Sequence, residues 1–236
     1  MAEERSSEAW AVRLGAVSGI AGALLGMVGN LLHPQGPTGN AEGVARTIAE
    51  SDLWIPVHLA IVVGLILMLG GLAAIHHAIQ HGLAGALARL GYATAIAGTT
   101  VGVVLVILDG LASKRIAEAW VTAPANEAAA ALRLVLAEQT INFALAALFN
   151  ILFAAVTFML FGLAVAASRS YPRWLGWVAA VAGAGSFGVG ILQAVTGEST
   201  GITQIATIVF PTVITLWIIV MGVLLLRRRE PATAVI

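Results

Sequence analysis

The sequence predicts an all-α integral membrane protein with six transmembrane helices. Of its 236 residues, 59% are hydrophobic and 10% are charged, whereas roughly a quarter of the residues of a soluble domain are charged. Six apolar stretches are each long enough to cross about 30 Å of hydrocarbon at about 1.5 Å per residue. The stretches are continuous and rich in Ala and Leu, unlike the alternating segments of about ten residues in a transmembrane β-barrel. A helical bundle is therefore expected.

The apolar stretches and the polar loops between them define the elements in order. One membrane domain is expected over residues 1–236, with spans at 11–32, 54–79, 84–112, 138–167, 174–196 and 202–226. Between the first two spans, segment 40–51 has apolar residues at helical spacing opposite a row of charged residues, which predicts an amphipathic helix on the outer membrane surface. An Ala-rich run after Pro124 is expected to extend the fourth span outward. Residues 231–236 are expected to form a short C-terminal tail.

Basic residues are distributed unevenly between the two sides of the predicted bundle. Of the twelve Lys and Arg residues, eight fall on the side of the termini. Because basic loops stay in the cytoplasm, both termini are predicted to be cytoplasmic. The eight are Arg5, Arg13, Arg89, Arg169, Arg173, Arg227, Arg228 and Arg229, against Arg46, Lys114, Arg115 and Arg133. Trp54, Trp174 and Trp177 lie near span ends, where Trp is expected to anchor at the interface.

The composition excludes cysteine chemistry and nucleic-acid binding. Cysteine is absent, which removes disulfides, thiolate metal sites and cysteine nucleophiles. Acidic and basic residues balance at twelve each, and no basic face interleaved with aromatic residues occurs, so nucleic-acid binding is not expected. The first apolar stretch lacks a clear small-residue cleavage site and is predicted to remain as a membrane helix.

Two pairs of segments resemble each other and predict an internal repeat. The sequence Met-Leu-Gly-Gly-Leu-Ala at 68–73 resembles Met-Leu-Phe-Gly-Leu-Ala at 159–164, and segment 90–98 parallels segment 175–183. Spans two and three would then repeat as spans four and five, around an axis near the membrane normal. Such hairpins are expected to leave a central cleft between them.

Ionisable and amide residues gather at one predicted depth, near the outer ends of the first four spans. Groups of this kind inside membrane helices usually face the bundle interior or water. Asn142 and Asn150 follow Glu138 at helical spacing, so these three are expected to line one stripe toward the membrane centre. The candidate site consists of His33, His58, Asp109, Glu138, Asn142 and Asn150.

Three interpretations of this cluster remain open. Its members can be ordinary interfacial groups, with Asp109 paired to Lys114 or Arg115. They can form an outward-facing vestibule that binds or moves a small ligand. They can also bind Zn²⁺ or another divalent ion, because imidazole nitrogen and carboxylate oxygen are suitable ligands. The candidate metal ligands are His33, His58, Asp109 and Glu138, although no HExxH or other spacing signature is present.

Two other histidine arrangements are not favoured. His77 and His81 have the four-residue spacing that can chelate a metal, but Gly82 follows directly and predicts a helix end. Haem is not expected, because no second membrane-embedded histidine lies at the depth of His58.

The leading functional hypothesis is a membrane protein that binds or moves a small ligand or assists a partner complex. The alternative is a membrane-embedded enzyme, metal-dependent or not, in which His58, Asp109 and Glu138 do acid/base work on a small or lipid-soluble substrate. A third reading is a purely structural subunit. The expected partners are the lipid bilayer, a small molecule, and either a second copy of the chain or another membrane subunit.

The sequence Tyr-Pro-Arg-Trp-Leu-Gly-Trp at 171–177 resembles a family of bacterial membrane proteins grouped as domain of unknown function 4386. A Pro-Arg-Trp-Leu-Gly opening of the penultimate helix is typical of that family. The resemblance extends more loosely to segment 40–75 and to the closing helix. Because the family has no established activity, the resemblance implies a topology and no site residues.

Overall fold

The computed structural model describes residues 2–37, 40–197 and 201–227, which are helical nearly throughout and contain no strand. Within these ranges six helical runs are long and apolar enough to cross a membrane, which confirms the predicted fold class. The predicted tail at 231–236 lies outside the described residues, as do Arg228 and Arg229. The elements are α1 (Ala2–Leu32), α2 (Ala41–Glu50), α3 (Trp54–Ala78), α4 (Gly82–Ile107), η1 (Leu108–Ala112), α5 (Ser113–Val121), α6 (Ala128–Phe149), η2 (Asn150–Thr157), α7 (Phe158–Ala167), α8 (Arg173–Thr196) and α9 (Gly201–Arg227).

The outside of the bundle is apolar. Large hydrophobic side chains such as Leu14, Ile66, Val181 and Ile208 are more than half exposed. A soluble protein rarely exposes apolar surface on this scale, whereas a bilayer accepts it. The chain is therefore a multi-pass membrane protein.

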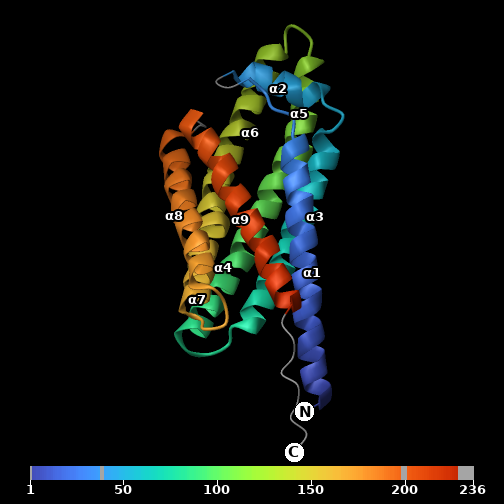
Figure 1. Ribbon diagram of the computed structural model, residues 1–236. Coiled ribbons are helices and arrows are strands. Elements are labelled where there is room, and N and C mark those ends of the chain that lie inside the picture. The colour runs from blue at the N-terminus through green and yellow to red at the C-terminus, as the bar shows by residue number, and fades with distance from the viewer. Residues whose placement is uncertain (1, 38–39, 198–200, 228–236) are drawn as a thin grey trace, which may run out of the picture.

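The six spans form a closed ring (Figure 1). Around the ring, α1 packs against α3 and α9, α9 against α8, α8 against the continuous helix α6–η2–α7, that helix against α4, and α4 against α3. The start of α1 and the last turn of α9 lie at one end of the bundle, and α2 lies at the other, which we call the α2 end.

Two helix pairs approach closely because glycine removes the side chain at the contact. A Cβ added to Gly19 of α1 would lie 2.7 Å from the Cα of Gly71 on α3. A Cβ added to Gly162 of α7 would lie 2.6 Å from the carbonyl oxygen of Gly176 on α8. Small residues at helix interfaces allow this close packing in membranes.

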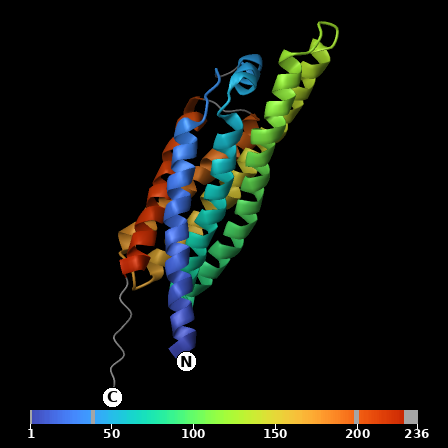
Figure 2. The ribbon, with the colours of Figure 1, turned by 90° about the vertical axis from the view of Figure 1, so that its right-hand side faces the viewer.

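The third span is longer than the sequence predicts, and the fourth is extended outward as the Ala-rich run after Pro124 predicts. The helical runs Gly82–Val121 and Ala128–Ala167 have 40 residues each, which is about 60 Å at 1.5 Å per residue and about twice the thickness of the hydrocarbon. Their ends project beyond the bundle as a hairpin (Figure 2). Lys114 and Glu138 resemble span limits in the sequence, but both are buried against neighbouring elements.

The amphipathic helix predicted over segment 40–51 is present as α2, and its apolar face packs on the protein. Its residues Ala45 and Ile48 are buried in a cluster with Ala117 and Trp120 of α5 and Val135 of α6. Its amphipathic pattern therefore reflects the projecting hairpin that covers its apolar face. Figure 1 shows α2 crossing the end of the bundle beside α5.

A π-helical segment interrupts each of the two long helices. In η1 the hydroxyl of Ser113 donates to the carbonyl of Leu108 at 3.4 Å, and in η2 the hydroxyl of Thr157 donates to that of Leu152 at 3.0 Å. Both contacts span the five-residue spacing of a π turn. Such segments occur frequently at functional sites.

Candidate functional site

The bundle contains a cavity of about 490 Å³ whose lining is most polar near the α2 end and mainly apolar further in, where Asn150 and Gln193 are polar. Val44 and Ile48 of α2 contribute to its lining at that end. The deeper walls are formed by apolar side chains from α3, α6, η2 and α9, among them Leu65, Met68, Phe149, Phe153 and Ile214. The polar lining near the α2 end includes His33, His58, Asp109, Glu138 and Asn142.

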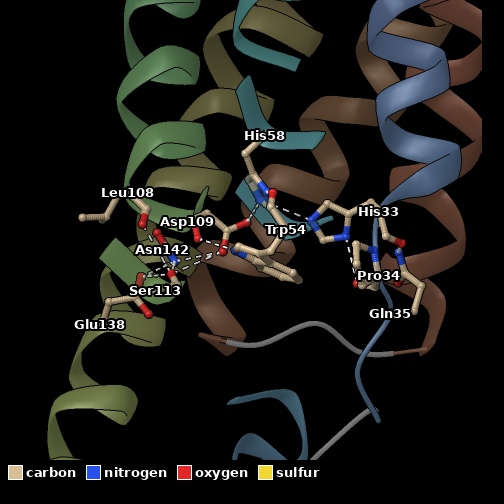
Figure 3. A network of polar contacts seen from close by, with 10 residues as sticks. All are labelled: His33, Pro34, Gln35, Trp54, His58, Leu108, Asp109, Ser113, Glu138 and Asn142. Atoms are coloured by element: carbon tan, nitrogen blue, oxygen red, sulfur yellow. Dashed lines mark hydrogen bonds and ion pairs between the residues drawn. The ribbon is translucent and has the colours of Figure 1, made fainter. Parts of the chain in front are cut away.

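Three of the predicted site residues converge there. The Nε2 atom of His33 lies 3.3 Å from Nε2 of His58, which lies 3.0 Å from Oδ2 of Asp109. One ligand atom from each residue lies within 4.8 Å of the other two. Figure 3 shows the three side chains pointing toward one another.

Each of the three side chains comes from a different part of the bundle. His33 directly follows the last residue of α1, His58 lies one turn into α3, and Asp109 belongs to η1. A Cβ added to Gly110 would lie 2.5 Å from the Cβ of His58. Because Gly110 has no side chain, η1 can lie against α3 and bring Asp109 to the imidazole.

Trp54 is part of the site and is not an interfacial anchor, so that prediction is wrong. Its side chain is only 4% exposed, and its indole N–H donates to the carbonyl of Asp109 at 2.9 Å. Its ring centroid lies 4.8 Å from that of His33 and 4.7 Å from that of His58. Its four-residue spacing from His58 on one helix is the signal that could have indicated this contact.

The hydrogen bonds of the two imidazoles determine which nitrogens carry protons. Nδ1 of His58 lies 2.6 Å from the carbonyl oxygen of Trp54, and Nδ1 of His33 lies 3.0 Å from that of Pro34. A carbonyl can only accept, so each Nδ1 is the protonated donor. In the neutral rings, both Nε2 atoms therefore carry lone pairs, and they face each other beside Asp109.

The pKa of His33 is lowered from its ordinary value. Burial is the largest cause, and the neighbouring His58 lowers the pKa further. The Asp109 carboxylate and the hydrogen bond to Pro34 act in the opposite direction. The neutral form, whose Nε2 can act as a ligand, is favoured as a result.

Glu138 is connected to the cluster but lies outside the group of three. The Ser113 hydroxyl donates to Oε1 of Glu138 at 2.6 Å. The Asn142 amide donates to the same oxygen and also to Oδ1 of Asp109, the latter at 3.3 Å. The structure thus corrects the predicted set of four metal ligands to three. Because α6 begins at Ala128, Glu138 lies well inside the helix, where Ser113 and Asn142 bind its carboxylate.

Asn150 is also separate from the cluster. Its side-chain amide donates to Oε1 of Gln193 at 2.7 Å, and both residues are buried in the cavity wall. Eight residues along the helix place Asn150 roughly 12 Å from Asn142. The predicted stripe therefore continues into the cavity, but its last member pairs across to α8.

The interfacial interpretation of Asp109 does not fit its contacts. Nζ of Lys114 donates to the carbonyls of Ile48, Ala49 and Ser51 at 3.1, 2.7 and 3.0 Å. Its ion-pair partner is Glu118, at 3.3 Å, and Arg115 also lies nearest to Glu118, at 3.8 Å. Lys114 and Arg115, which the sequence suggests as cationic partners of Asp109, therefore bind other groups.

The histidines at the opposite end of α3 form no comparable group. His76 stacks on Tyr92 with ring centroids 5.4 Å apart. The helix ends at Ala78, so His77 and His81 do not share one helical face. In the described parts of the chain, a group of three potential metal ligands is found at His33, His58 and Asp109.

The chain matches no family model, no curated protein and no solved structure. Its resemblance to the domain of unknown function 4386 proteins therefore stays a prediction.

Proposed function

We propose that the protein binds a small amphipathic molecule inside the bundle. The observation that carries this proposal is the two-part lining of the 490 Å³ cavity, with polar groups at one end and apolar side chains beyond them. Ligand sites typically have volumes of about 300–1,000 Å³, mostly apolar walls and a few convergent polar groups. The polar group of the ligand would bind near His58 and Asn142, and its apolar part would extend past Leu65 toward Phe153.

The charges at the polar end indicate which polar group would bind. Asp109 and Glu138 are acidic, and no Lys or Arg is found among the described residues that line the cavity. An anionic group would be repelled there unless a cation were bound with it. A hydroxyl or an amine is better suited, because the carboxylates and imidazoles offer acceptors for its hydrogens.

Two glycines allow this proposal to be tested with a matched pair of variants. A Cβ added to Gly26 or to Gly188 would meet no atom within 4 Å. Gly26 of α1 lines the cavity, whereas Gly188 of α8 does not. The substitution Gly26→Leu should therefore fill the cavity without a backbone clash, and Gly188→Leu is the control on a face away from it.

The experiment is native mass spectrometry of the purified chain in a nonionic detergent with a long-chain alcohol, amine or carboxylate. The unsubstituted chain and Gly188→Leu should form a saturable one-to-one adduct with the alcohol or the amine. Gly26→Leu should lose that adduct while keeping its elution volume and helix content. An equal adduct in both variants, or none in the unsubstituted chain, would show that the cavity does not bind such molecules.

A second candidate function is a membrane-embedded enzyme that acts on the bound molecule with His58, Asp109 and Glu138. It is supported by the hydrogen bonds through Asn142, which connect the two carboxylates beside an imidazole. General acid/base catalysis requires groups of this kind within hydrogen-bonding reach of the substrate. Mass spectrometry of a membrane lipid extract after incubation with the protein should then reveal a product that His58→Ala does not form.

We further propose that both termini are cytoplasmic in the inner membrane, and that the α3–α4 hairpin is repeated as α7–α8. The orientation is supported by Arg13, Arg89, Arg169, Arg173 and Arg227, which belong to the end of the bundle opposite α2. The repeat is supported by the similarity between segments 90–98 and 175–183. A fluorescent protein fused after the last residue should fold, and a periplasmic phosphatase fused there should be inactive.

Co-purification of a stoichiometric subunit would instead support the hypothesis that the protein assists a partner complex.

A further inference from the structure

Three electron-pair acceptors face one point at the polar end of the cavity. Both Nδ1–H groups are bonded to carbonyls, so the Nε2 atoms of His33 and His58 present lone pairs to each other at 3.3 Å. Oδ2 of Asp109 is also an acceptor and lies 3.0 Å from Nε2 of His58. Nε2 of His58 is common to both contacts, so a proton there could be shared between the other two acceptors, whereas a metal cation could bind all three atoms.

We propose that His33, His58 and Asp109 bind a divalent transition-metal ion, with Zn²⁺ as the ion that fits best, and that its open coordination position faces the cavity. Zn–N bonds of about 2.0–2.1 Å at a tetrahedral angle place two ligand nitrogens about 3.3 Å apart. The Nε2 atoms of His33 and His58 are 3.3 Å apart in the structure. Two imidazoles and one carboxylate form a ligand set typical of zinc sites that keep a position free.

Each of the three ligands is oriented by a second contact on its far side. The carbonyls of Trp54 and Pro34 fix the imidazoles, and the Asn142 amide donates to the Asp109 oxygen that does not face the histidines. Outer contacts of this kind fix the tautomer and the direction of metal ligands. Trp54 also packs against both imidazoles. These contacts hold each ligand atom on the side that faces the other two, with all three atoms within 4.8 Å of one another.

The charges around the site also favour a cation. Asp109 and the buried Glu138 share Asn142 as a donor, and a buried carboxylate is costly unless a cation compensates its charge. A divalent ion at the three ligands would compensate both. Glu138 would then stay free of the metal, as an acceptor beside the open position.

The chemistry of the ligands limits which metal ions the site can bind. The chain contains no cysteine, so the thiolates that select soft ions such as Cu(I) are absent. Two imidazoles with one carboxylate also suit Fe²⁺, so the choice between Zn²⁺ and Fe²⁺ is made by titration.

The open position gives the metal a role toward the proposed ligand. Zn²⁺ there would bind the hydroxyl, amine or carboxylate of an amphipathic molecule whose apolar part occupies the cavity. This assignment of the open position rests on the proposed function, whereas the binding of the ion does not. An anionic polar group, which the metal-free site would repel, becomes acceptable when the ion is present.

The test uses the purified full chain in detergent, stripped of metal with a chelator and titrated calorimetrically with Zn²⁺, and with Fe²⁺ under anaerobic conditions. One Zn²⁺ per chain is expected. His58→Ala and Asp109→Asn should each weaken binding more than about 100-fold, beyond the range of changes to outer contacts. Glu138→Gln should weaken it less. His76→Ala and His77→Ala, at the opposite end of α3, should bind Zn²⁺ as the unsubstituted chain does.

A second measurement needs no variant and therefore does not depend on the folding of one. Co²⁺ bound to the unsubstituted chain should give the visible absorption of a tetrahedral site, and added Zn²⁺ should remove it. The absence of saturable Zn²⁺ binding, or equal affinity in His58→Ala and the unsubstituted chain, would overturn the site. Tighter binding of Fe²⁺ than of Zn²⁺ would overturn the identity of the ion. Because these titrations contain no added long-chain alcohol, amine or carboxylate, and adducts can be measured on the stripped protein, the two proposals can fail separately.

Discussion

Asn150 and Gln193 are joined by a hydrogen bond of 2.7 Å in the wall of the cavity, within two membrane-spanning helices. Both side chains are buried. This hydrogen bond connects α8 to the π-helical segment η2 inside the bundle.

Replacing either member of this pair should destabilise the protein, because the other amide is left without its partner. Asn150→Leu and Gln193→Leu should each lower the free energy of unfolding, and the double variant should lose less than the sum. Measured couplings of this kind in a membrane protein average about 0.6 kcal/mol and reach about 1.7 kcal/mol. Reversible unfolding of the four proteins in mixed micelles measures the coupling. Strictly additive losses would mean that the hydrogen bond contributes nothing.

The hydroxyl of Ser113 supports the buried carboxylate of Glu138, to which it donates at 2.6 Å. Ser113→Ala should lower the free energy of unfolding by about 1–3 kcal/mol, because it removes a donor from a buried group. The control is Ser170→Ala in the exposed connection between α7 and α8, for which a change within about 0.5 kcal/mol is expected. Thermal unfolding in detergent compares the two. Equal midpoints would contradict a structural role for this contact.

Lys114 attaches α2 to the projecting hairpin, because its ammonium donates to three carbonyls at the C-terminal end of α2. A cation at this end of a helix also complements the helix dipole. Lys114→Ala should therefore increase amide hydrogen exchange across Ala41–Glu50, with little change elsewhere. Arg115→Ala is the matched control, since its side chain is 78% exposed and contacts Glu118 alone among acidic groups of the described chain. Unchanged exchange in α2 of Lys114→Ala would show that its apolar contacts suffice.

Much of the fold could be predicted from hydropathy. Six spans were expected, and the described residues contain six helices long and apolar enough to cross a membrane, because continuous apolar runs of this length identify membrane helices directly. The outward extension of the fourth span was predicted from its Ala-rich run, whereas the continuation of the third span past residue 112 was not. Lys114 and Glu138 look like residues outside a membrane, yet Lys114 binds α2 and Glu138 binds Ser113 and Asn142.

The level of the candidate site along the helices could be predicted from the sequence, but the contacts between its side chains could not. Residue positions along the helices place His33, His58 and Asp109 at one level, and the structure brings these three together. Which side chains touch depends on how each helix is rotated. A helix that is apolar on all sides carries no sequence signal for that rotation, so the contact of Gln193 with Asn150 was missed.

The two π-helical segments have a consequence for how each long helix meets its neighbours. One extra residue in a turn rotates everything that follows by about 100° relative to a regular α-helix. Helix α4, before η1, can therefore keep Gly98 against Phe153. Helix α5, after η1, directs Lys114 toward α2. Deleting one residue from η1 would restore a regular α-helix. Either Gly98 or Lys114 could then keep its present contact, but not both.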